Sequence, residues 1–451
     1  GRVLDLGAGF DGPLHLGPDE GISPALIASA TARATARGRP LPGAFMSSKP
    51  GAGINHKMYG VTSEGVNVFL EEALRAAGIE PRTDTFTVKL TGGPDGDVAG
   101  HQLRILHREY GERARVVGIA DGSGAARDPA GLAHAELLRL VDAGAGIAAF
   151  DPARLGPEGQ VVPVEAPEGR RVRNALCFDV DADAFVPAGG RPATVHAGNW
   201  RRFFREGRPT CRVIVEGANL FLTSEARAAL SRSGVLVVKD SSANKCGVIS
   251  SSLEIAASMI LDEAGWALHK PRLVREVLER LRELAREEAR RLFADHARDP
   301  TVPLPDRSEA LSQAILQVTQ AVEAETSAWS DVDEAALDDV VKAYLPAVLV
   351  EVAGDALREK LPRRYRDRVV ATRLAARFVY REGVDALAHV PEGGLGPAVL
   401  RYHAHEVEVA RLAAAVRASG VEGAERAAAL LEAGDPRAAL FEAGAPRAAD
   451  A

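Results

Sequence analysis

The sequence predicts an α/β protein in which a doubly wound sheet is followed by a helical region. Two observations predict this fold class: helical and strand patterns alternate between residues 62 and 262, and no convincing strand pattern follows residue 266. Such alternation is typical of a parallel sheet covered by helices. The 451 residues are 46% hydrophobic and 26% charged, a composition that excludes a predominantly disordered protein.

The N-terminal 61 residues are rich in glycine and proline and contain one expected helix, from Pro24 to about Arg37. Ser23 can cap the first amides of this helix, and proline is tolerated in a first turn. The chain begins with Gly1 instead of Met and leads at once into a strand-like run. We therefore expect that an upstream part is missing.

Residues 62–262 hold the alternating elements. After Thr62, apolar residues at three-and-four spacing predict a helix, and the next helix is expected to end near Tyr110. Further helices are expected from Asp128 to about Ala143 and over 224–233. The expected strands lie at 86–90, 115–121, 174–178, 184–187, 212–216 and 235–238, and the Pro- and Gly-rich stretch 151–174 is expected to be a loop or hairpin excursion.

Composition limits the classes of function. The net charge of −7 argues against a nucleic-acid partner. Three cysteines without a CxxC pair favour a reducing compartment, and we expect a cytoplasmic protein. No run approaches ~18 consecutive apolar residues, so no membrane-spanning helix is expected.

A glycine-rich turn follows the first strand of the alternating region. Gly92, Gly93 and Gly96 lie between an expected strand and an expected helix, where backbone amides can approach a pyrophosphate. Asp121 ends the next strand, where a carboxylate can bind ribose hydroxyls. The alternative is a turn that only reverses the chain. Because no basic residue directly follows Asp121, NAD is favoured over NADP, although Arg127 lies nearby.

Several segments then match one family in order: GPDEGIS (17–23), YGVTSEGV (59–66), TGGPDGDVAG (91–100), DGSGAARDPAGL (121–132), VPAGGRP (186–192), VEGANLFLT (215–223) and KDSSANKCGVISSSLE (239–254). Over residues 14–262 the chain resembles the large-subunit, NAD-specific branch of the glutamate dehydrogenases, within the amino-acid dehydrogenase superfamily. The resemblance implies the C-terminal part of a substrate domain at 1–61 and a Rossmann-like NAD-binding domain at 62–262. A helical region at 263–420 and a disordered tail at 421–451 complete the expected organisation.

The resemblance also implies roles for the acid and hydroxyl groups. Asp19 matches the family's general acid/base, which exchanges protons with the substrate nitrogen; the alternative is an ordinary turn aspartate. Thr62 matches the residue that holds the nicotinamide amide, and its alternative is a helix cap. Ser251 matches the serine that donates to the substrate's distal carboxylate, with Ser250 and Ser252 as alternative registers.

The nicotinamide end of the cofactor is expected at two further motifs. Asn219 and Asn244 match two asparagines that line the nicotinamide pocket, since an amide can both donate to and accept from a carboxamide. Their alternative is to satisfy their own turns. Pro187, Gly189 and Gly190 match the loop that lies against the same end of the cofactor.

The resemblance implies oxidative deamination of L-glutamate to 2-oxoglutarate and ammonium, with NAD as the hydride acceptor, by a homo-oligomer. The family's substrate lysines have no match here, and Lys49 is expected only to flank the cleft. Two alternatives stay open: a dehydrogenase of leucine or phenylalanine, and a non-catalytic NAD-binding module if the native chain starts near Gly1. No metal site is expected, because His403 and His405 would point to different faces of a helix, and Cys246 is expected to be a buried thiol.

Overall fold

The computed structural model describes residues 15–18, 22–39, 41–49, 51–326, 337–390 and 394–433. The chain divides into two compact units. The first comprises Gly1–Ser308 and Pro346–Leu357, and the second comprises Glu309–Leu345 and Arg358–Ala451. The predicted limits 1–61, 62–262, 263–420 and 421–451 stay a prediction. Every described residue of the predicted site belongs to the first unit.

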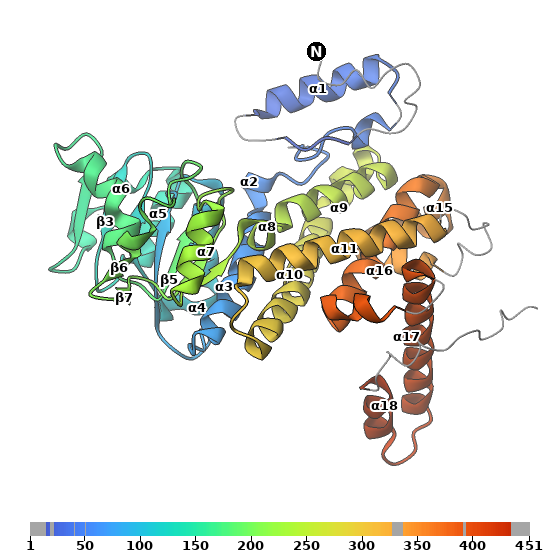
Figure 1. Cartoon of the computed structure of the whole chain (residues 1–451). Coiled ribbons are helices and arrows are strands. Elements are labelled where there is room, and N and C mark those ends of the chain that lie inside the picture. The colour runs from blue at the N-terminus through green and yellow to red at the C-terminus, as the bar shows by residue number, and fades with distance from the viewer. Residues whose placement is uncertain are drawn as a thin grey trace, which may run out of the picture. The chain divides into compact units, whose positions relative to one another are not determined.

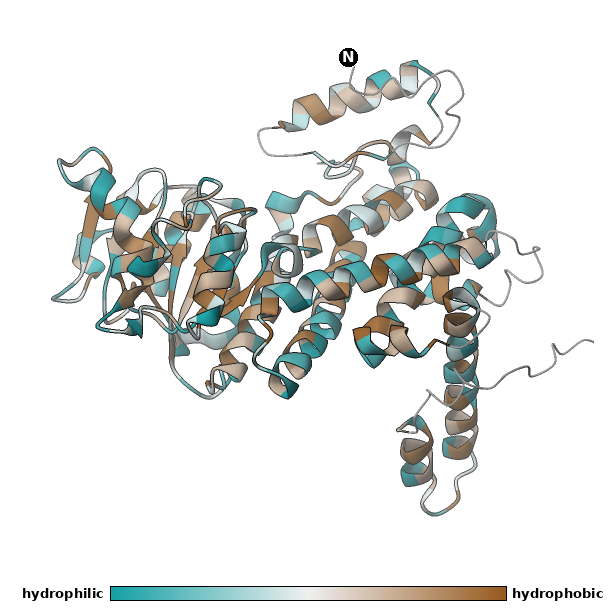
Figure 2. Cartoon of the chain, viewed as in Figure 1, coloured by the Kyte–Doolittle hydropathy of each residue, from teal (hydrophilic) through white to brown (hydrophobic). Residues whose placement is uncertain are grey.

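A seven-stranded sheet forms the centre of the first unit, in the order β4-β3-β2-β1-β5-β8-β9 (Figure 1). Five strands are parallel: β1 (Phe86–Thr91), β2 (Ala114–Ala120), β5 (Ala184–Pro187), β8 (Val213–Val215) and β9 (Leu236–Val238). Their near-continuous apolar runs are typical of strands that are buried on both faces. The strands at this centre are coloured as hydrophobic in Figure 2. The predicted doubly wound parallel sheet is confirmed.

Two strands at one edge run antiparallel to their neighbours and were not predicted. β3 (Gly124–Arg127) pairs with β2, and β4 (Gln160–Pro163) pairs with β3. The stretch 151–174 is therefore more than a loop or hairpin excursion, because it contributes one strand to the main sheet. Four-residue strands with little apolar alternation leave almost no periodic signal in a sequence.

The helices of the first unit include several that the sequence predicts and several that it does not. They are α1 (Pro24–Ala36), α2 (His56–Tyr59), α3 (Val61–Ala76), α4 (Asp97–Tyr110), α5 (His134–Ala143), α6 (Gly169–Asp179), α7 (Ser224–Arg232), α8 (Asp240–Ala243), α9 (Cys246–Ile260), α10 (Glu263–Arg298) and α14 (Ala347–Ala353). The Ser23 hydroxyl caps α1 by accepting from the Leu26 amide. α3 packs against α4, α9, α10 and strand β8, so it joins the sheet to the helical region.

Two predicted elements were wrong. Residues 174–178 lie inside helix α6 and form no strand, because Leu176 and Ala175 follow Val172 at helical spacing on one packed face. The helix expected from Asp128 begins only at His134, since residues 128–133 form a turn in which Asp128 Oδ1 accepts from the Ala130 amide.

A lysine is buried in the middle of the central strand. The Lys89 side chain is 0% exposed, and Nζ donates to the Val180 and Thr210 carbonyls at 2.6 and 3.2 Å. The ammonium group also lies 5.4 Å from the centre of the Phe203 ring. Burial lowers the pKa of Lys89. The carbonyls and the ring compensate the desolvated ammonium, so this lysine stabilises the junction of β1 with the end of α6.

The remaining helices are α11 (Leu304–Thr326), α13 (Asp338–Tyr344), α15 (Leu357–Lys360), α16 (Arg363–Glu382), α17 (Leu395–Ala418) and α18 (Ala424–Glu432). Short 3-10 turns and one two-stranded ribbon complete the elements: η1 (Pro42–Ala44), η2 (Gly111–Arg113), η3 (Ile147–Ala149), η4 (Pro152–Arg154), η5 (Trp200–Phe203), η6 (Gly354–Ala356), η7 (Val384–His389), β6 (Phe204–Arg205) and β7 (Arg208–Pro209). No strand follows residue 266 in the described ranges, as predicted. Within those ranges, the search for a helix of membrane-spanning length and hydrophobicity finds none.

Two leucines of α10 test which face of that helix stabilises the fold. Leu281 is 0% exposed and Leu268 is 73% exposed. We expect Leu281→Ala to lower the free energy of unfolding by about 2–5 kcal/mol, because it leaves a cavity in the core. Leu268→Ala, the matched control, should change it by less than about 0.5 kcal/mol. Urea denaturation followed by circular dichroism measures both values, and equal losses would contradict the assigned face.

Candidate functional site

Two glycine turns meet at the carboxyl ends of β1 and β5. The Ala188 amide donates to the Thr91 carbonyl at 2.8 Å. A Cβ placed on Gly92, whose φ is +92°, would lie 2.9 Å from the Gly189 amide nitrogen. The two backbones therefore approach more closely than a side chain at Gly92 would allow. This contact brings the predicted residues Gly92, Gly93, Pro187, Gly189 and Gly190 to one place.

Asp121 lies directly against the first of these turns. Its Oδ1 accepts from the Ser123 hydroxyl at 2.6 Å and from the Ser123 and Gly124 amides, and its Oδ2 accepts from the Ile147 amide at 2.7 Å. A Cβ on Gly93 would lie 1.9 Å from Asp121 Oδ2. Position 93 therefore requires glycine to make room for the carboxylate of Asp121.

A second carboxylate faces the same turn. The Asp95 Oδ1 atom would lie 2.7 Å from a Cβ on Gly93, so both acids border this glycine. Burial and the charge of Asp121 raise the pKa of Asp95. Gly96, the third predicted glycine, is the N-cap of α4, and its amide donates to the Gly93 carbonyl at 2.9 Å. The turn thus leads into a helix N-terminus, a position that favours anions.

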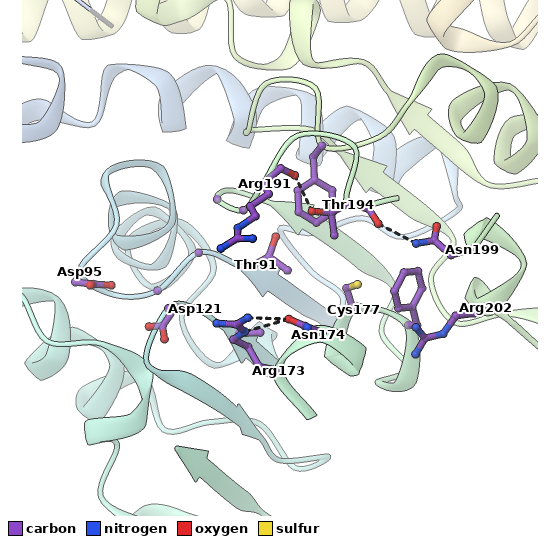
Figure 3. Close-up of a pocket in the computed structure, with 18 residues that line it drawn as sticks. Thr91, Asp95, Asp121, Arg173, Asn174, Cys177, Arg191, Thr194, Asn199 and Arg202 are labelled. Carbon is purple, nitrogen blue, oxygen red and sulfur yellow. Dashed lines mark hydrogen bonds between the residues drawn. The ribbon is translucent and has the colours of Figure 1, made fainter. Parts of the chain in front are cut away.

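A cavity of about 640 Å³ opens beside this turn (Figure 3). Asp95 and Asp121 lie at one end of it and Arg202 lies at the other. The Arg202 guanidinium stacks over the Phe178 ring, with 4.2 Å between its central carbon and the ring centre. The cavity is lined by glycines of both turns and by side chains of β1, of α6 and of the segment after β5, among them Thr91, Arg173, Asn174, Cys177, Arg191 and Asn199.

Sequence reasoning missed most of these lining residues. Arg173, Cys177 and Phe178 belong to α6, which the sequence analysis interpreted as a loop followed by a strand. The helical spacing of the apolar residues in α6 was the signal that could have identified this wall. Arg191 directly follows the predicted Gly190, and its basic side chain next to a proposed phosphate-binding turn was a second available signal.

The two predicted asparagines contact each other. Asn244 Nδ2 donates to Asn219 Oδ1 at 2.6 Å and to the Gly217 carbonyl at 3.3 Å. Asn219 is exposed and Asn244 is half-buried. They come from the loops that follow β8 and β9. The predicted pair is therefore brought together at the same edge of the sheet as the glycine turns.

A buried ion cluster holds these two loops. Arg227 of α7 donates to Glu216 from Nε at 2.5 Å and contacts Asp240 at 3.0 Å. Glu216 is 0% exposed and also accepts from the Leu222 amide, while Asp240 accepts from the Leu220 amide at 2.8 Å. Glu216 lies just before the loop that carries Asn219, and Asp240 begins the short helix α8, whose C-cap is Asn244. One guanidinium thus links both loops.

The start of α3 approaches the start of α9. A Cβ on Gly247 would lie 3.1 Å from Thr62 Oγ1, and a Cβ on Gly65 would lie 2.7 Å from Cys246 Sγ. Cys246 is buried, as predicted, and burial raises the pKa of its thiol to about 12. These small residues place Thr62 against the first turn of α9, one turn before Ser251.

Ser251 contacts two polar side chains of the N-terminal segment. Ser47 Oγ donates to Ser251 Oγ at 3.0 Å, and His56 Nε2 lies 3.4 Å from the same oxygen. Ser250 is 0% exposed. The contacts of Ser251 and the burial of Ser250 therefore favour Ser251 over Ser250 as the serine that matches the family's substrate residue.

The Lys49 ammonium group forms an ion pair with a buried carboxylate. Its Nζ donates to Glu254 Oε1 at 3.0 Å and to the Met46 carbonyl at 2.7 Å. Glu254, 0% exposed, also accepts from the Ser48 and Ile54 amides. The expectation that Lys49 only flanks the cleft agrees with this arrangement. The predicted acid Asp19 lies outside the described residues.

Comparison with known proteins finds relatives of this chain among the amino-acid dehydrogenases. The family model described as Glutamate/Leucine/Phenylalanine/Valine dehydrogenase matches residues 52–325. A probable NAD-specific glutamate dehydrogenase of Schizosaccharomyces pombe is 34% identical over 399 residues, covering 83% of this chain and 35% of that protein. An NAD-specific glutamate dehydrogenase of Neurospora crassa is 33% identical over 409 residues, covering 84% of this chain and 38% of that protein.

This chain spans about a third of the length of these curated relatives. Among solved structures, a glutamate dehydrogenase of Plasmodium falciparum aligns with a TM-score of 0.45 at 18% identity. That alignment covers 59% of this chain and 52% of the other.

The buried cluster predicts a specific dependence of stability on pH. Burial raises the pKa of Glu216 from its ordinary value of 4.5 to about 7, although Arg227 opposes this shift. A carboxyl whose pKa is higher in the folded state stabilises the fold most below pH 4.5, and this stabilisation is lost as the pH rises to about 7. The glutamine of Glu216→Gln is neutral at every pH. The free energy of unfolding of this variant should therefore rise relative to that of the natural protein as the pH increases from 4.5 to about 7.

Urea unfolding at several pH values between 4.5 and 7 measures this difference. Glu158→Gln removes an exposed carboxylate and is the matched control. A difference between the Glu216→Gln variant and the natural protein that stays constant across the window would contradict the prediction.

Proposed function

This chain belongs to the glutamate/leucine/phenylalanine/valine dehydrogenase family, and from that premise we propose that it carries the dinucleotide-binding part of an NAD-dependent glutamate dehydrogenase. The reaction is the reversible oxidative deamination of L-glutamate to 2-oxoglutarate and ammonium. One observation carries the proposal: glycine turns, an acid and two asparagines from separate motifs meet at the carboxyl edge of a parallel sheet. Dinucleotides bind at this edge in doubly wound folds.

The lining of the cavity fits a dinucleotide. Thr91 lines the cavity, and its buried Oγ1 has no hydrogen-bond partner among the described residues, which is the kind of group that a polar ligand satisfies. Asp121 Oδ2 accepts from the Ile147 amide, and a carboxylate oxygen has a second lone pair for a ribose hydroxyl. The N-terminus of α4 favours the pyrophosphate. We therefore assign Gly92, Gly93, Gly96 and Asp121 to NAD binding.

When bound, NAD supplies the acceptor for the hydride that leaves the Cα of glutamate. Asn219 and Asn244 would orient the carboxamide of the nicotinamide, since each amide has both a donor and an acceptor. Thr62 and the loop with Pro187, Gly189 and Gly190 would enclose the same end of the cofactor. Such fixed donors select the ring face that is presented to the substrate.

Ser251 would donate to the distal carboxylate of the substrate. Asp19 stays a prediction as the group that exchanges protons with the substrate nitrogen. Because Lys49 is paired with Glu254, the α-carboxylate of the substrate requires a cation from another part of the full-length protein, as the resemblance implies. A cytoplasmic homo-oligomer also stays a prediction.

The glycine at position 93 tests the cofactor site. Gly93→Ala would place a Cβ 1.9 Å from Asp121 Oδ2, so the carboxylate or the turn must move. We expect NADH binding, measured by fluorescence titration, to weaken by about tenfold or more, equivalent to ~1.4 kcal/mol. Gly51→Ala is the control, because nothing lies within 4 Å of a Cβ there. Unchanged affinity in Gly93→Ala would mean that the dinucleotide binds elsewhere.

The identity of the substrate is tested by following the absorbance of the NADH that the natural full-length protein forms from NAD and an amino acid. We expect reduction of NAD with L-glutamate at a kcat/KM at least about 100-fold above that with L-leucine or L-phenylalanine, because a site built for a polar group rejects apolar analogues. Preference for leucine or phenylalanine would reassign the substrate within the family. NAD binding without turnover of any of the three would favour the non-catalytic module.

A further inference from the structure

Three polar side chains converge beside the start of α9. Ser47 precedes α2, His56 is the first residue of α2, and Ser251 belongs to α9. Ser47 Oγ donates to Ser251 Oγ at 3.0 Å, and His56 Nε2 lies 3.4 Å from the same oxygen. Ser47 and His56, which are 204 and 195 positions from Ser251 in the chain, therefore form one cluster of hydroxyl and imidazole groups with it.

The His56 imidazole lies near Ser251 and also near Gly247, which contacts the proposed nicotinamide residue Thr62. A Cβ on Gly247 would lie 3.8 Å from His56 Nδ1 and 3.1 Å from Thr62 Oγ1. Gly247 and Ser251 are four positions apart on α9, so they share one face of this helix. The imidazole consequently lies on the face of α9 that joins the proposed nicotinamide residue Thr62 to the proposed substrate residue Ser251.

Two lysines of the same region already have hydrogen-bond partners. Lys49 Nζ is bound to Glu254 Oε1 at 3.0 Å, and Lys270 Nζ donates to the Gly51 carbonyl at 2.7 Å. Glu254 further accepts from the backbone of residues 48, 49 and 54. A ligand carboxylate at Ser251 would therefore find hydroxyl and imidazole groups there, while both of these ammonium groups already have partners.

We infer that His56 is a substrate-specificity residue that, with Ser251, receives the side-chain carboxylate of glutamate, while the buried Ser47 hydroxyl holds Ser251 in place. This inference rests on the proposed function and names an additional residue of that site. Burial lowers the pKa of His56, so at neutral pH the imidazole is uncharged and can offer one N–H as a donor. Removal of a donor to a charged group weakens binding of that group, and leaves binding of an apolar analogue unchanged.

The test compares L-glutamate with L-norvaline, whose side chain has the same number of carbons and no carboxylate. In the natural full-length enzyme, we expect His56→Ala to lower the ratio of kcat/KM for glutamate to that for norvaline by about tenfold or more. The loss should appear as a higher KM for glutamate, while the affinity for NADH stays within about twofold. His56→Gln should restore part of the ratio, because its amide supplies a donor at similar reach.

His107→Ala changes an exposed histidine of α4 and is the matched control, with an expected ratio equal to that of the natural enzyme. An unchanged ratio in His56→Ala, or an equal loss for glutamate and norvaline, would overturn the role of His56. A natural enzyme that oxidises norvaline or leucine in preference to glutamate would overturn the proposed function itself. The two failures are thus distinguished by the behaviour of the unsubstituted protein.

Discussion

The arrangement of the candidate site depends on one buried guanidinium. Arg227 is 5% exposed and is shared by Glu216 and Asp240, which are 0% and 5% exposed. Burying three charges is costly, and such a cluster persists only when each group is paired and hydrogen-bonded. Here each carboxylate also accepts a backbone amide from residues 220–222. The loops after β8 and β9 consequently have one common anchor, and the contact between Asn219 and Asn244 follows from it.

Close packing explains the glycines of the site better than turn geometry alone. Gly92 has a positive φ, but the stronger constraint is the approach of the Gly189 backbone. Gly93 is required because the Asp121 carboxylate occupies the space of a Cβ. The same acid is held by amides at both oxygens. The glycine turn and the acid, which sequence motifs treat as two separate cofactor contacts, are therefore one packed unit.

Local pattern predicted the centre of the fold but not its long-range contacts. The strands β1, β2, β5, β8 and β9 are apolar runs, which are recognisable without knowledge of their neighbours. Strands β3 and β4 have no such pattern, and α6 was predicted as a strand because its apolar residues are clustered in sequence. The site residues found by motif were those near glycine or asparagine. Arg227 and His56 carry no local signal, since their roles depend on contacts with Glu216 and Ser251.

The meeting of α3 with α9 joins the two halves of the proposed chemistry. Gly65 and Gly247 remove the side chains that would separate these helices, so Thr62 lies against the first turn of α9. Ser251 follows one turn later on the same face, where Ser47 contacts it from the N-terminal segment. Hydride transfer requires donor and acceptor atoms to be held within van der Waals contact. In this fold, the proposed nicotinamide residue Thr62 and the proposed substrate residue Ser251 lie at consecutive turns of α9, which are about 5.4 Å apart along the helix axis.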